Sequence, residues 1–124
     1  MSKTKSLRDL AVAAVILAAL IILTATNVMI CSRSINRLAE NAEKISIGDV
    51  EKAKTMEEDF RRTAFFLSIT VNHDDIDNAH GELLELVRTV ESDDSAALEI
   101  AKSRLIAALG QLKRLSGIGI DSII

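Results

Sequence analysis

The chain has 124 residues, which is enough for one domain, with 48% apolar residues, 27% charged residues and a formal net charge of -3. This acidic balance excludes a basic nucleic-acid binder, and the aromatic content of 2% excludes a base-stacking platform. The single cysteine excludes an internal disulfide and a cysteine-rich zinc site.

The first predicted element is a transmembrane helix over residues 10–30, which follows a short basic tail over residues 1–9. The apolar run carries no charge, and at about 1.5 Å per residue it covers roughly 30 Å of hydrocarbon. A cleavable secretory signal is the alternative interpretation, because such signals also place basic residues before an apolar core. The run exceeds the usual length of a signal core, and Arg33 and Arg37 follow it directly, so the pattern favours an uncleaved anchor.

The charges on the two sides of this span predict its orientation. Lys3, Lys5 and Arg8 lie close together before the span, which favours a cytoplasmic N-terminus and an extracytoplasmic helical domain at the cell membrane. Cys31 lies at the far boundary of the span. It either completes the span as a small apolar residue, forms an intermolecular disulfide across a dimer, or carries a palmitoyl group.

Residues 31–124 are predicted to form a small antiparallel helical bundle of two hairpins, so the fold class is all-α. Polar breaks near residues 48, 72–75 and 92–94 separate stretches with helical spacing of apolar residues. Two of the junctions resemble each other, which leaves open either tetratricopeptide-like repeats or two hairpins without duplication. The expected helices cover residues 32–46, 50–71, 74–91 and 94–115, and an apolar tail over residues 116–124 is expected to fold back over a helix seam.

The end of the second of these helices is apolar on nearly every face. Residues 63–71 read TAFFLSITV, which is also typical of a strand, but the rest of the chain offers no strand to pair with it. We therefore expect a helix in which Phe65, Phe66 and Ile69 form an interaction surface. Another element, a protein partner or the lipid surface would cover these side chains.

A candidate metal site follows from the spacing of His73, Asp77 and His80. Steps of four and three residues place these side chains on one face of a helix, where two imidazoles and a carboxylate suit zinc or another divalent metal. The alternative is structural: His80 also falls on the apolar stripe between Ile76 and Leu83, and His73 lies at the start of its helix.

A cluster of acids at the start of the same helix is the other candidate for chemistry. Asp74, Asp75 and Asp77 could act as a general acid and base, but acids in a first helical turn are also favoured by the helix dipole. No glycine-rich loop or nucleophile motif accompanies them in the sequence. We therefore expect no catalytic residues, no cofactor and no enzyme activity.

Four stretches resemble a known family: NHDDIDNAHGELLEL, ESDD, LIAALGQLKRL and the closing GIDSII. They are similar to the short bacterial membrane-anchored helical proteins called domain of unknown function 4363. His73, Asp75, Ile76 and Asp77 match its His-x-acid-Ile-Asp element, and Phe65 or Phe66 stands where the family has a Trp. The resemblance implies a membrane anchor followed by helices and implies no activity.

These observations predict a single-pass membrane protein that displays a helical protein-interaction domain for scaffolding or assembly. Its expected partners are the lipid bilayer and either another protein or a second copy of the chain, and nucleic acid is not among them. The alternative function is a membrane-anchored ligand or metal sensor that uses His73, Asp77 and His80. A membrane-bound hydrolase that uses the aspartate cluster is a third hypothesis.

Overall fold

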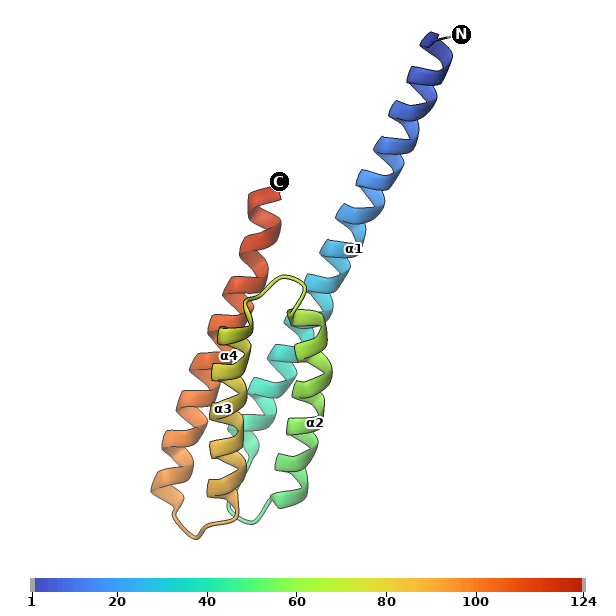
Figure 1. Ribbon diagram of the computed structural model, residues 1–124. Helices are drawn as coiled ribbons and strands as arrows, with labels where there is room; N and C mark the ends of the chain where they lie inside the picture. The colour runs from blue at the N-terminus through green and yellow to red at the C-terminus, as the bar shows by residue number, and fades with distance from the viewer. Residues whose placement is uncertain (1, 124) are drawn as a thin grey trace.

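The computed structural model describes the backbone of residues 2–123 and the side chains of residues 3–116. This part of the chain forms an all-α fold of four helices joined by short connections, and successive helices run in opposite directions (Figure 1). The predicted fold class is therefore confirmed. The helices are α1 (Ser2–Lys44), α2 (Val50–Leu67), α3 (His73–Val90) and α4 (Ser95–Ile123).

The four helices close into one bundle. Each packs against the next along the chain, and α4 also packs against the C-terminal half of α1 (Figure 1). A stack of helical repeats would leave its first and fourth helices apart, since each repeat contacts only its neighbours. Of the two alternatives, the contact between α1 and α4 favours two hairpins closed around a common core.

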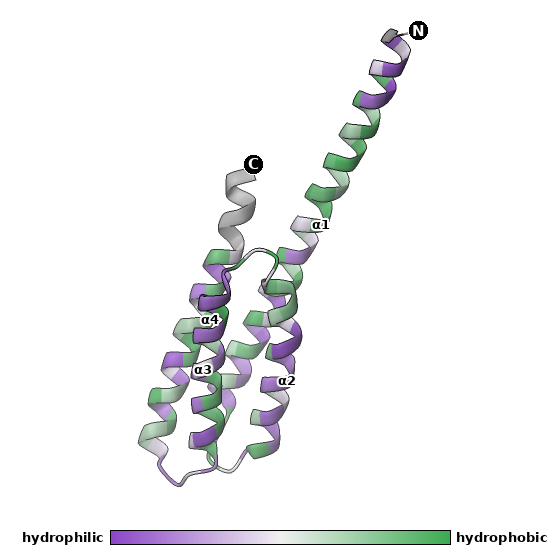
Figure 2. Ribbon diagram, in the orientation of Figure 1, coloured by the Kyte–Doolittle hydropathy of each residue, from purple (hydrophilic) through white to green (hydrophobic). Residues whose placement is uncertain are grey.

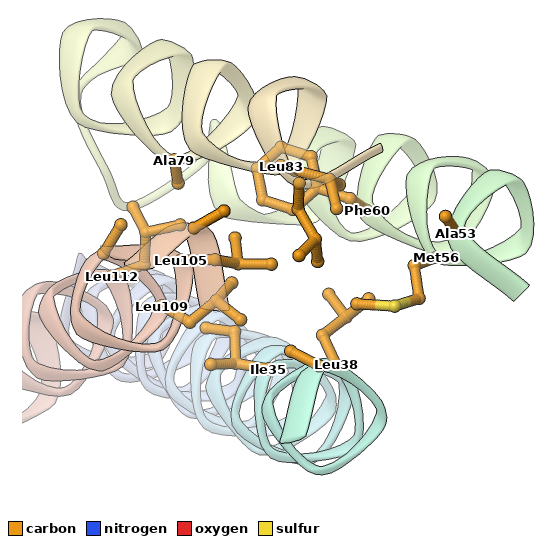
Figure 3. Packing of buried hydrophobic residues seen from close by; sticks show 14 of the residues in the cluster. Ile35, Leu38, Ala53, Met56, Phe60, Ala79, Leu83, Leu105, Leu109 and Leu112 are labelled. Carbon is orange, nitrogen blue, oxygen red and sulfur yellow. The ribbon is translucent and has the colours of Figure 1, made fainter. Parts of the chain in front are cut away.

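The core is built from the apolar stripes of all four helices (Figure 3). Phe60 of α2 lies near Leu83 of α3, and Leu38 of α1 approaches the same centre from the opposite side (Figure 3). Burying each large side chain of this kind stabilises the fold by about 1.5–3 kcal/mol. The buried apolar residues are Cys31, Ile35, Leu38, Ala42, Ile45, Ala53, Met56, Phe60, Leu67, Val71, Ile76, Ala79, Leu83, Leu86, Val90, Leu98, Ala101, Leu105, Ala108, Leu109 and Leu112.

One end of the bundle contains the α1–α2 and α3–α4 connections, and we call it the distal end. Gly48 adopts φ +89°, a left-handed conformation that glycine reaches without a Cβ penalty, and its N–H donates to the Val90 carbonyl at 3.0 Å. This hydrogen bond links the α1–α2 connection to the last residue of α3. In the α3–α4 connection, the Asp94 carboxylate accepts from the Ala97 N–H at 3.0 Å and caps α4.

The observed helix bounds correct the predicted end of α2. The helix ends at Leu67 rather than at residue 71, because the chain then turns through residues 68–72 into α3. The Ser68 hydroxyl donates to the Phe65 carbonyl at 2.6 Å, and such local hydrogen bonds compete with helix continuation. The turn buries Val71, and the Asn72 side chain then accepts from the Asp74 N–H at 3.3 Å to cap α3.

The prediction that α4 ends at residue 115 is wrong. The helix continues to Ile123, so the backbone of residues 116–123 is helical rather than a tail that folds back. A glycine in a helix interior is disfavoured by only about 1 kcal/mol relative to alanine, and Gly117 and Gly119 therefore need not end the helix. The apolar side chains expected to cover a helix seam at residues 118, 120, 123 and 124 lie outside the described residues.

Candidate functional site

The N-terminal half of α1 projects beyond the bundle and is apolar on its exposed sides (Figure 2). By length and composition α1 can cross a membrane, and almost none of its most apolar segment is buried within the protein. Thr24, a polar residue in this segment, donates its hydroxyl hydrogen to the Leu20 carbonyl at 2.8 Å. The exposed large apolar residues here are Leu7, Leu10, Val12, Val15, Ile16, Leu17, Leu20, Ile21, Ile22, Leu23, Met29 and Ile30.

The same helix enters the bundle core without a break. Met29 and Ile30 are exposed, whereas Cys31, Ile35 and Leu38 are buried at helical spacing on one face. The anchor segment and the first core helix predicted from the sequence are therefore one continuous element. The basic residues predicted as an N-terminal tail also belong to it, because α1 begins at Ser2.

Cys31 lies in the core, which corrects two of its three predicted roles. Its side chain is fully buried and has no disulfide partner in the chain. Burial also raises the pKa of the Cys31 thiol, because the thiolate would lose its hydration. A buried neutral thiol is a poor substrate for oxidation or acylation, so neither a disulfide across a dimer nor palmitoylation fits this position.

The turn between α2 and α3 carries the predicted interaction surface at the end of the bundle where α1 projects. Phe65, Phe66 and Ile69 are 71%, 38% and 68% exposed, and we call these three residues the apolar tip. The two phenyl rings contact each other edge to face, with centroids 5.5 Å apart. The surface predicted from the sequence is thus exposed at one place, and α2 and the following turn position it.

Asn27 connects the apolar tip to α1. Its side-chain amide donates to the Phe66 carbonyl at 3.2 Å, across a separation of 39 residues. Sequence reasoning missed this contact. Its signal was an amide within an otherwise apolar span, because a polar side chain in such a segment requires a hydrogen-bond partner.

Most backbone N–H groups of this turn have partners within the turn. The N–H groups of Ser68, Thr70 and Val71 donate to carbonyls of the last turn of α2 at 2.8–3.0 Å, and the N–H of Ile69 donates to the Phe66 carbonyl at 3.3 Å. The Phe66 carbonyl is also the acceptor for Asn27. The turn therefore presents apolar side chains without a row of unpaired backbone donors.

The three residues of the candidate metal site line one hollow of about 360 Å³ between α2 and α3. In the described part of the chain, however, no three His, Cys, Asp or Glu side chains are close enough together to hold a metal ion. His80 instead stacks on Phe60, with ring centroids 5.6 Å apart and the ring planes 7° from parallel. His73, Asp77 and His80 thus share a helix face but form no ligand set.

The surroundings of His80 explain this outcome. Its Nε2 atom is buried, has no hydrogen-bond partner, and lies 3.7 Å from a Glu57 carboxylate oxygen. The same oxygen accepts from Arg61 at 2.8 Å, so the carboxylate already has a charged partner. The neighbouring helix α2 therefore holds the imidazole by stacking it on Phe60.

The acids of the third hypothesis lie where the helix dipole favours them. Asp74 and Asp75 occupy the first turn of α3, directly after the Asn72 cap. Asp77 and Asp74 are exposed to solvent. The favourable interaction of these carboxylates with the helix dipole accounts for the cluster, because it stabilises the start of α3.

Comparison of the chain with protein-family models, curated proteins and solved structures found no match. The resemblance to the membrane-anchored helical family stays a prediction that depends on the motifs in the sequence.

Proposed function

We propose that this is a single-pass membrane protein in which residues 10–30 cross the bilayer and the bundle is a scaffold or assembly domain. The observation that carries the proposal is the continuity of α1. Its first half exposes apolar side chains that water would disfavour, and its second half supplies one wall of the bundle core. A helix of this kind would hold the bundle directly at the membrane surface.

The apolar tip supports an interaction role for the bundle. Three large apolar side chains gathered at one turn form a patch of the kind that marks a contact surface. Among the other bundle side chains that the structure describes, the exposed large apolar residues are Leu84 and Ile100, on α3 and α4. We therefore propose that the apolar tip is a contact surface of the bundle, for lipid or protein at the membrane.

We also propose that the N-terminus is cytoplasmic and that the bundle is extracytoplasmic at the cell membrane. The support is the basic cluster ahead of the span, which follows the positive-inside rule. The resemblance to bacterial membrane-anchored proteins agrees with this arrangement.

Three measurements on the full-length protein in its own membrane test the proposal. Alkaline carbonate extraction should leave the protein in the membrane fraction, and protease added from outside the cell should digest the bundle. A photo-crosslinking side chain at Ile69, Leu84 or Ile100 should join the bundle to a protein partner or a second copy from at least one of these positions. Release by carbonate would contradict the anchor, and the absence of protein crosslinks from all three positions would contradict the assembly role.

A further inference from the structure

We infer that the apolar tip is a second membrane contact, inserted into the lipid interface beside the spanning helix. The inference rests on the proposed anchor and adds the chemistry of the surface that covers the tip. It follows from three observations: the level of the tip along α1, the lack of charge in the turn, and the hydrogen bonding of its backbone.

The hydrogen bond from Asn27 to the Phe66 carbonyl sets the level of the tip. Asn27 lies three residues before the end of the apolar run at Ile30, which is about 4.5 Å along a helix. The tip is therefore level with the last turn of the segment that is proposed to cross the bilayer. Side chains at that level meet lipid except where they face α1 or α4, which continues past the α2–α3 turn toward the same side (Figure 1).

An arrangement with the tip in water would require α1 to move out of the bilayer as well. The remaining apolar run, residues 10–26, is 17 residues long, which is about the shortest length that spans a bilayer. Met29 and Ile30, which are 55% and 44% exposed, would then also face water. Immersion of the apolar tip keeps its three side chains, together with Met29 and Ile30, in contact with lipid.

Charge is excluded from the whole turn. The ten residues from Thr63 to Asn72 include no Asp, Glu, Lys or Arg, whereas Arg61 and Arg62 precede them and Asp74 and Asp75 follow. Charged side chains of both signs thus flank the turn in the sequence, where we expect lipid headgroups and water beside the inserted tip. Because the flanking charges are mixed, apolar burial rather than attraction to anionic lipid drives the insertion.

The backbone of the turn is suited to this environment. Unpaired N–H groups are costly in hydrocarbon, and the N–H groups of residues 68–71 all have intramolecular acceptors. The exposed Ser68 hydroxyl also donates to a carbonyl, that of Phe65. The turn therefore resembles an interfacial wedge in which apolar side chains are exposed and the backbone N–H groups are paired, although the buried Thr70 hydroxyl has no hydrogen-bond partner.

The absence of Trp and Tyr from the chain gives a direct test, because one introduced Trp is the only strong fluorophore. Full-length Ile69→Trp is reconstituted in phosphatidylcholine vesicles with and without phosphatidylglycerol. The matched control is Ile100→Trp at the distal end, where the native side chain is 55% exposed. Leu20→Trp reports on the middle of the span.

Lipid-attached quenchers should reduce the emission of Ile69→Trp, with the indole roughly 5–10 Å into the boundary between headgroups and acyl chains. Aqueous acrylamide should quench Ile100→Trp and leave Ile69→Trp protected, with or without phosphatidylglycerol. Quenching of Ile69→Trp by acrylamide to the same extent as Ile100→Trp, with Leu20→Trp still protected in the bilayer, would overturn the inference and leave the anchor in place. Protection of Ile69→Trp from both quenchers would also overturn it, because a second protein copy would then cover the tip. Exposure of Leu20→Trp to acrylamide would instead refute the proposed anchor.

Discussion

Both ends of the bundle reverse the chain direction, but one end exposes polar residues and the other exposes apolar residues. Each end reverses the chain between antiparallel helices through four or five residues. At the distal end, Ile45 is buried and the exposed positions include Ser46, Asp93 and Asp94. At the opposite end, from which α1 projects, the turn buries Leu67 and Val71 but leaves the apolar tip outside.

This difference shows that the exposure of the tip is not a requirement of chain reversal. At the distal end, the apolar side chain of Ile45 points into the core. Hydrogen bonds to backbone carbonyls and to the Asp49 carboxylate stabilise the connections. The N–H groups of residues 68–71 also have intramolecular partners, and yet the apolar tip presents its large side chains outward. Its composition is therefore better explained by what lies outside the bundle than by its folding.

Replacing buried residues should give the largest effect and should be similar at the two ends. Leu67→Ala and Ile45→Ala each remove a side chain that is at most 1% exposed, and each should lower the free energy of unfolding by about 2–5 kcal/mol. Ile69→Ala, only two residues from Leu67, should change it by less than about 0.5 kcal/mol in detergent micelles. Denaturant unfolding of the full-length protein, followed by circular dichroism, gives these values. Equal losses for Leu67→Ala and Ile69→Ala would show that the tip packs within the bundle.

Backbone strain should distinguish the distal end from a regular helix. Gly48→Ala places a Cβ at φ +89° and should lower the free energy of unfolding by about 1–2 kcal/mol, although no atom lies within 4 Å of the new methyl group. Gly81→Ala is the matched control, since it lies in α3 and also has open space around its added Cβ. It should raise the stability by about 0.5–1 kcal/mol because alanine favours helix. The same denaturant measurement compares the two, and a Gly48→Ala variant as stable as the native chain would contradict the strain.

The attachment of the tip to α1 should depend on a single amide. Asn27→Leu removes the donor to the Phe66 carbonyl and should lower the stability by about 0.5–1.5 kcal/mol. Hydrogen exchange of the amides of residues 68–71 should become faster, because the turn loses its link to α1. Thr24→Val is the control, since its hydroxyl bonds within its own helix. Unchanged exchange in Asn27→Leu would show that packing alone holds the tip.

The smallest effect concerns pH at the point where α1 enters the core. Burial raises the pKa of Cys31 above its ordinary value of 9.0, so the unfolded chain releases the thiol proton at a lower pH than the folded chain. Stability from this group is complete below the unfolded pKa and falls as pH rises toward the folded pKa, by at most about 1.4 kcal/mol per pH unit. Cys31→Ala should show a shallower alkaline decline in denaturant unfolding than the native chain. Parallel declines would assign the alkaline loss to other groups.

The sequence predicted most of the fold because each helix carries a stripe with the correct period. Ile76, Leu83 and Val90 are spaced by seven residues, and all three are buried. Gly48 and Asn72 marked two of the helix boundaries through their turn and capping preferences. The end of α2 and the extension of α4 were missed, because a single serine or glycine does not determine whether a helix continues.

The candidate site was predictable in its residues and not in its geometry. Phe65, Phe66 and Ile69 were recognisable because they add apolar surface outside the helical stripe of α2. The level of the tip depends on the Asn27 contact, which joins residues far apart in the sequence. The spacing of His73, Asp77 and His80 was correct for a shared face, but stacking of His80 on Phe60 depends on the neighbouring helix.

If α1 crosses the bilayer as proposed, its uninterrupted course determines how the bundle faces along the membrane plane. A helix turns by about 100° per residue, so the azimuth of the bundle around its anchor depends on the number of residues between Asn27 and Cys31. One alanine inserted there would rotate the anchor amide away from the Phe66 carbonyl while leaving both halves of α1 intact. Helix register would thus determine which flank of the bundle is presented to neighbouring molecules in the membrane plane.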